Sequence, residues 1–124
     1  MIRKDYIQRY FDELAKVLAA VLQLKNDLKP IEAETKLNDF STDFLGVNLS
    51  EIEEQNTDKL IDYLIQQKDF TLTHFKLLED VLYHKYLMNS SDEKIKKLTL
   101  EVLKYVAETD TDYSVERNNR INEL

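Results

Sequence analysis

The chain has 124 residues, 43% of them hydrophobic and 33% charged, with a formal net charge of −7, a balance typical of one folded domain over residues 1–124. With no cysteine, the sequence excludes disulfides, Cys-ligated zinc and thiol catalysis. One glycine and one proline are too few for the turns of a sheet protein, so the composition favours an all-α fold.

The first predicted element is a long amphipathic helix over residues 5–28. Apolar residues recur every seven positions from residue 7 to Leu28. A second apolar set has the same period and lies three positions after the first three members of this set. Between residues 14 and 22 only Lys16 is polar, so we expect this helix to be covered on several sides and to form the spine of the fold. Its heptad pattern also predicts a self-association seam made of Tyr10, Leu14, Val17, Val21 and Leu24.

Turn and capping residues divide the middle of the chain. Pro30 separates the first helix from a second over residues 31–45, and Gly46 stands where a left-handed residue ends a helix. Ser50 and Glu53 have the spacing of a capping box that opens the next helical segment. A possible interruption at residues 56–58 leaves open whether residues 50–67 form one helix or two.

The second half of the chain contains the pattern of an internal helix. Residues 70–88 carry two apolar stripes on nearly opposite faces, which predicts a helix sandwiched between neighbours. A helix from about residue 93 follows and is broken at residues 109–112. The last helix, roughly residues 113–124, has few apolar anchors. The chain thus predicts five or six helices with short loops, arranged antiparallel in a bundle or in a short solenoid of helical hairpins.

Two stretches resemble known families. With Phe75 and Leu78 in the large and leucine positions, and Glu79 where a small residue is usual, residues 73–124 resemble the layout of tetratricopeptide-type hairpins. The opening Asp5-Tyr6-Ile7-x-Arg9, followed by leucines and a lysine, is similar to a family of small uncharacterised bacterial proteins. Neither resemblance implies an activity.

Acidic residues concentrate between residues 31 and 62, where nine of them face only two lysines. This acidic segment would repel the phosphate backbone of a nucleic acid, so we expect no nucleic-acid binding. An acidic docking face is predicted at Glu51, Glu54, Asp58 and Asp62. Glu51 and Glu54 also form the first half of the E-x-x-E and E-x-x-D pair with which helical phosphohydrolases of the MazG type hold Mg²⁺. The second half is missing, because the acids of the following helix are adjacent in sequence.

The remaining polar residues form no recognisable catalytic set. His74 and His84 are about 15 Å apart along one helix and cannot share a metal. Arg117 and Arg120 are too few for a nucleic-acid footprint. We therefore assign no catalytic residue, no cofactor and no metal ligand.

Three functions from different classes remain. The first is a non-enzymatic helical module for protein–protein interaction, homodimeric through the first helix. The second is an acidic inhibitor or immunity-type protein that covers a basic partner, and the third is a Mg²⁺-dependent all-α hydrolase. The sequence has neither a membrane span nor the apolar run of a signal peptide near its start, so we expect a cytoplasmic protein without membrane partners.

Overall fold

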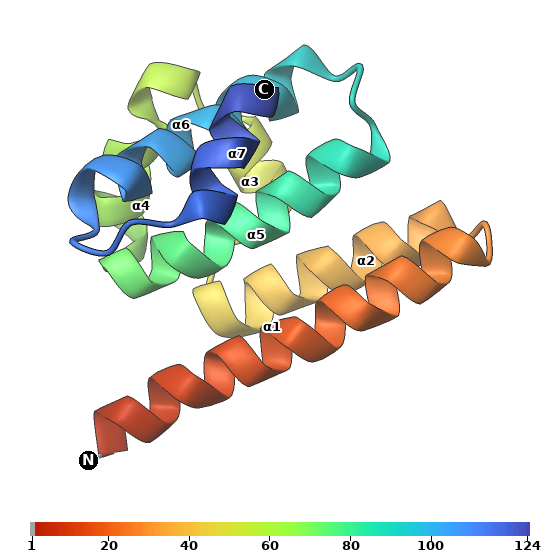
Figure 1. Ribbon diagram of the computed structural model, residues 1–124, viewed down its shortest axis with the longest axis horizontal. Coiled ribbons are helices and arrows are strands. Elements are labelled where there is room, and N and C mark those ends of the chain that lie inside the picture. Colours follow the sequence, from red (N-terminus) through yellow and green to blue (C-terminus); the bar gives the residue numbers. More distant parts are fainter. Residues whose placement is uncertain (1) are drawn as a thin grey trace.

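The computed structural model describes the backbone of residues 2–124 and the side chains of residues 7–124. All regular elements in this range are helical, which confirms the all-α prediction (Figure 1). A π-helical turn over Ser41–Leu45 follows the second helix, and a 3-10 turn over Thr57–Lys59 precedes the fourth. The α-helices are α1 (Ile2–Asn26), α2 (Pro30–Phe40), α3 (Leu49–Glu53), α4 (Leu60–Lys68), α5 (Leu72–Met88), α6 (Glu93–Thr109) and α7 (Val115–Glu123).

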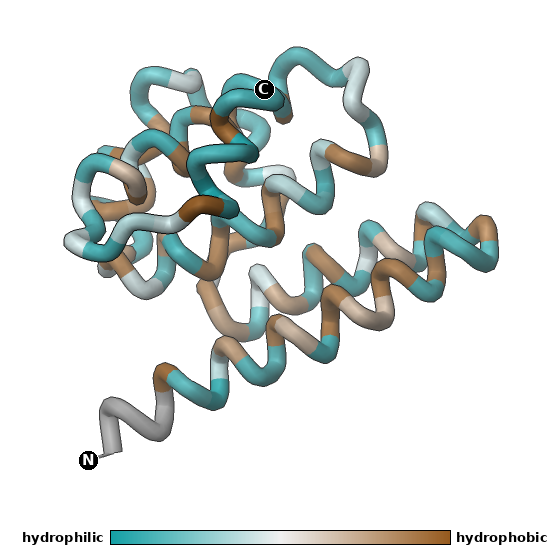
Figure 2. The backbone as a smooth tube through the Cα atoms, viewed as in Figure 1, coloured by the Kyte–Doolittle hydropathy of each residue, from teal (hydrophilic) through white to brown (hydrophobic). Residues whose placement is uncertain are grey.

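Helices α1 and α2 form an antiparallel hairpin that lies along one side of the molecule (Figure 1). Apolar positions recur along both helices on the sides that face each other (Figure 2). Aromatic rings close the hairpin at its open end, where the Tyr10 and Phe44 ring centroids are 5.0 Å apart and Phe44 stacks on Phe40 at 5.0 Å. The hairpin is therefore held by its own apolar seam.

Helix α5, and not α1, is the centre of the fold. It contacts α1 and α2 on one side and α6 on the other (Figure 1). Its buried apolar residues are Phe75, Leu77, Leu78, Val81 and Leu82, so the prediction of an internal helix is confirmed.

The prediction that α1 is the spine is wrong, because its apolar middle is covered on one side only. Ala15 and Ala19 are exposed, and Leu22 is 51% exposed. The small alanine side chains leave little apolar surface to bury, so that face can remain in contact with water.

Local backbone chemistry sets the helix ends. Gly46 has the predicted left-handed conformation, with φ 74°. The predicted helix over residues 31–45 is a regular α-helix only to Phe40, because the chain widens into the π-helical turn, where the buried Ser41 Oγ donates to the Val47 carbonyl at 2.6 Å. The segment 50–67 contains two α-helices, and Asn48, not Ser50, caps the first by accepting from the Glu51 amide.

Helix α7 is hydrophilic over most of its length and packs mainly on α6 (Figure 2). Tyr113, two residues before this helix, and Val115, its first residue, are apolar but 76% and 63% exposed. Its attachment therefore depends on polar contacts, which are described below. Between residues 2 and 124, none of the helices combines the length and apolar content that a membrane span requires.

Candidate functional site at the end of the helical hairpin

The residues predicted to form a self-association seam lie inside the chain's own core. Tyr10, Leu14 and Val21 are 9%, 2% and 0% exposed, and Val17 and Leu24 are partly buried against the same core. These five side chains join α1 to the rest of the molecule. A second copy could reach them only if the hairpin opened, so any docking surface on the closed fold has to lie elsewhere.

The predicted acidic face is divided by the break between α3 and α4. Glu51 forms an ion pair with Lys68 at 2.8 Å and accepts a hydrogen bond from the Tyr63 hydroxyl at 3.2 Å. The hydrogen bond from Lys68 is the main reason that the pKa of Glu51 is lowered. Glu54, Asp58 and Asp62 are exposed. The single acidic stripe required an unbroken helix, which the structure does not have.

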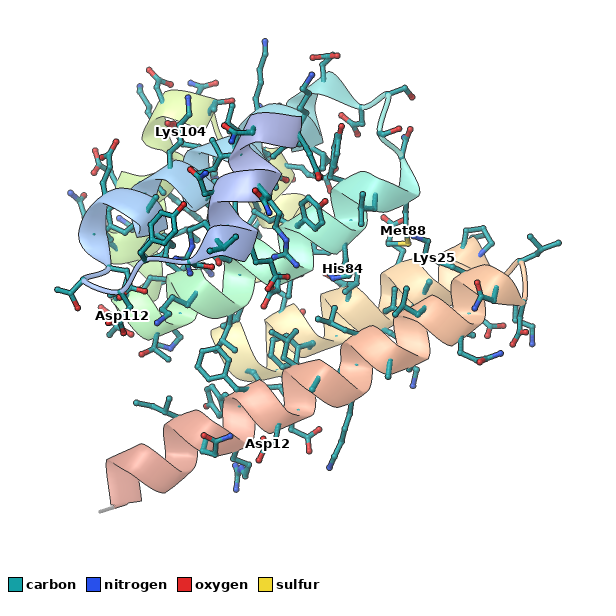
Figure 3. The ribbon with its side chains drawn as sticks, in the orientation of Figure 1. Asp12, Lys25, His84, Met88, Lys104 and Asp112 are labelled. Carbon is teal, nitrogen blue, oxygen red and sulfur yellow. The ribbon has the colours of Figure 1, made fainter. Side chains whose placement is uncertain are left out.

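Neither the acidic residues nor the histidines gather into a metal-binding set. No group of three or more potential metal-ligating side chains is found within the described part of the chain. His74 caps α5, where its Nδ1 accepts from the Thr71 amide at 3.0 Å. His84 is half-buried and projects from α5 toward the hairpin (Figure 3). Burial lowers the pKa of both histidines, so each is mainly neutral at neutral pH.

A buried ion pair between α5 and α7 was missed at the sequence level. The Arg117 Nε donates to both carboxylate oxygens of Glu79, at 2.8 and 2.9 Å, and the two residues are 7% and 5% exposed. Burial raises the pKa of Glu79, and Arg117 partly opposes this. The signal was present in the sequence: a carboxylate between the two apolar stripes of an internal helix needs a buried cation as its partner.

Further charges extend this pair into a network that holds α7 in place. Asp110 forms an ion pair with Lys76 at 3.1 Å, and Arg120 pairs with Asp80 at 2.5 Å while covering the Tyr83 ring at 4.2 Å from its centroid. Every cation named here has an anionic partner. The network therefore explains the docking of a hydrophilic helix and leaves no free guanidinium for a ligand.

An open groove surrounds the first turns of α2, and we call it the tip groove. It consists of three adjoining hollows of about 380, 220 and 430 Å³. The first and second share Pro30 and Met88, and the second and third share Glu34 and Glu53. Lys25 at the end of α1 and Met88 at the end of α5 lie side by side at its apolar end (Figure 3). The other main lining residues are Leu28, Ile31, Lys85, Leu87, Asn89 and Asp92.

Leu28 at the rim of this groove has an unusual backbone conformation. Its φ is +59°, in the left-handed region, and its amide donates to the Lys25 carbonyl at 3.1 Å. The next amide, of Lys29, donates to the Leu24 carbonyl at 2.8 Å, which completes a Schellman motif. Glycine is the usual residue at this position, and a residue with a Cβ atom loses roughly 1–2 kcal/mol there. Leu28 is nevertheless 87% exposed and adds almost nothing to the core.

Large apolar side chains are exposed along the tip groove. Among those between residues 7 and 124, Leu28 and Ile31 have the highest exposed fractions, 87% and 81%, and Leu87 is 42% exposed. All three line the groove. A strained, exposed leucine beside two other exposed apolar residues is typical of a surface that binds another molecule.

The middle of the tip groove is acidic. Lys85, whose side chain is 11% exposed, lies 2.5 Å from Glu34 and 3.9 Å from Glu53, so one cation serves two carboxylates. Asp92 adds a further negative charge at the rim, where its Oδ1 accepts from the amides of Lys94 and Ile95 as the cap of α6. The groove therefore joins an apolar end to a middle with an excess of negative charge.

Comparisons with protein-family models, with curated proteins and with solved structures found no match. The similarity to small bacterial proteins and the tetratricopeptide-type layout therefore stay predictions from the sequence. The tip groove has apolar side chains, carboxylates and two lysines, of which Lys85 is bound in ion pairs and Lys25 lies at the apolar end. These groups can bind and orient an amphipathic segment.

Proposed function

We propose that the protein is a non-enzymatic module for protein–protein interaction and that the tip groove is its docking surface. The observation that carries this proposal is Leu28, which has a left-handed backbone and an almost fully exposed apolar side chain at the groove rim. A glycine there would remove both the strain and the exposed surface. The leucine is best explained by a contact with a partner that the isolated chain lacks.

The proposed layout is a stack of helical hairpins, α1–α2 and α5–α6, with α7 added at the end. Its support is the antiparallel packing of α1 on α2 and of α5 on α6, together with the contact of α5 with both members of the first hairpin. Such a stack leaves grooves between hairpins, as repeat proteins do for their partners. We place this module in the cytoplasm as a binding protein.

Self-association remains one form of this proposal, through a different surface from the predicted seam. Leu14 and Val21 are enclosed in the fold, whereas Leu28, Ile31 and Leu87 are accessible. A homodimer of the closed fold would therefore use the tip groove and the hairpin turn beside it.

A photo-crosslinking amino acid placed at position 28 or 31 tests the proposal in the native cell. We expect a discrete adduct from both positions that is lost when Leu87→Asp is added, because this change puts a charge into the apolar end of the groove. The control position is Thr111, which is exposed in the loop after α6. No adduct from position 28, or the same adduct from position 111, would overturn the proposal. An adduct of twice the chain mass would identify a homodimer.

A further inference from the structure

Resting on the proposed function, we infer that the natural occupant of the tip groove is a positively charged amphipathic helix of a different protein. The groove is largely apolar where Leu28, Leu87 and Met88 line it beside Lys25, and acidic where Glu34 and Glu53 meet. A matching helix has apolar residues toward one end of its contact face and lysine or arginine residues one or two turns further on. The apolar part supplies most of the affinity, and the charges supply direction and register.

The shape of the groove favours a helix over an extended strand. It follows α2 from Pro30 to Asn38, which is about 12 Å or roughly two helical turns. Strand addition needs a sheet edge with free amides and carbonyls, and residues 2–124 contain no strand. An amphipathic helix satisfies its own backbone and needs only side-chain contacts, which the groove offers.

Charge argues against a second copy of the chain as the occupant. Each copy carries a net charge of −7, so two acidic groove rims would repel each other. Within the described side chains, the largest group of exposed basic residues on one helix is on α6, at Lys94, Lys97 and Lys104. None of the exposed large apolar side chains of the described range lies on α6, so this helix has a basic face without apolar anchors.

A fluorescent helical peptide of leucine and lysine, about 14 residues or about 21 Å long, is a suitable probe. Its companion carries glutamate in place of each lysine. We expect fluorescence anisotropy to show binding of the Leu/Lys peptide to the full chain, with an affinity that falls as salt is raised. The Leu/Glu peptide should bind at least about tenfold more weakly. Equal binding of the two peptides would overturn the inference.

Matched pairs of variants locate the binding. Glu53→Lys changes the groove, and Asp62→Lys makes the same charge change on an exposed site outside it. Leu87→Ala and Ile65→Ala remove side chains that are 42% and 39% exposed, inside and outside the groove. We expect each groove variant to weaken binding of the Leu/Lys peptide at least about tenfold, and each control to change it less than about twofold. Equal losses in both members of a pair would refute the assigned location.

The outcomes separate this inference from the proposed function. If position 28 forms its crosslink but the Leu/Lys peptide does not bind, the docking surface stands and the basic helix is wrong. If light scattering shows a dimer that Leu87→Asp dissociates, the occupant is a second copy and the inference is likewise wrong. If neither the crosslink nor peptide binding is observed, both fail. Circular dichroism of each variant confirms that it is folded.

Discussion

Replacing Leu28 with glycine should stabilise the protein. A leucine with φ +59° loses roughly 1–2 kcal/mol relative to its ordinary conformations. Glycine avoids this loss, although its greater freedom in the unfolded chain offsets about 0.5–1 kcal/mol of the gain. The side chain is 87% exposed, so its removal leaves no cavity. The net increase in the free energy of unfolding should be about 0.5–1 kcal/mol, or about 2–4 °C in Tm for a chain of this length.

Urea and thermal unfolding followed by far-UV circular dichroism measure this change. Leu28→Ala is the control, because alanine removes the apolar side chain but keeps the Cβ atom and therefore the strain. We expect its free energy of unfolding to stay within about 0.5 kcal/mol of the wild-type value. The reasoning is refuted if the glycine variant is no more stable than the alanine variant. The glycine variant should also bind the Leu/Lys peptide less well, so stability and binding would change in opposite directions.

Three further changes test the core, the ion network and the histidines. Leu14→Ala should lower the free energy of unfolding by about 2–5 kcal/mol in urea, without changing the mass measured by light scattering, because Leu14 is 2% exposed inside one chain. Arg117→Ala should lower the free energy of unfolding by about 3–5 kcal/mol, since it leaves Glu79 charged and buried, and this deficit should shrink as the pH is lowered and Glu79 takes up a proton. NMR titration of His84 should give a pKa below the ordinary 6.5, so protonation below about pH 6.5 should favour the unfolded chain.

Each of these expectations has a clear contrary result. A smaller particle mass for Leu14→Ala would show that the residue joins two copies. A deficit for Arg117→Ala that grows as the pH falls would show that Glu79 is not the uncompensated charge, because a raised folded-state pKa requires the opposite sign. A His84 pKa at or above 6.5 would show that the ring is hydrated or faces a carboxylate.

Residue patterns predicted the helices well where a single physical cause dominated. Gly46 was recognised because only glycine easily adopts the left-handed conformation that ends a helix. The two apolar stripes of residues 73–88 identified an internal helix because both faces had to be buried. In each case the local requirement and the final fold agree.

The errors arose where the sequence could not indicate which neighbour was present. The heptad pattern of residues 7–28 fits a seam within one chain as well as one between two chains, and α2 fills it here. The heptad pattern includes Leu28, but α1 ends at Asn26, and Pro30 disfavours helical backbone at Lys29, so Leu28 lies outside the helix. The tip groove was not predicted, because it depends on the approach of the end of α5 to the hairpin turn.

Because α5 belongs to the cores of both hairpins, the two halves of the chain cannot open independently. Loss of either half would expose one of the two apolar stripes of the same helix to water. Subglobal opening should therefore be suppressed across the middle of the molecule, and the amides of α5 should exchange with deuterium only through global unfolding. The ends of α1 and α7 can open without exposing either apolar stripe of α5, so their amides should exchange sooner.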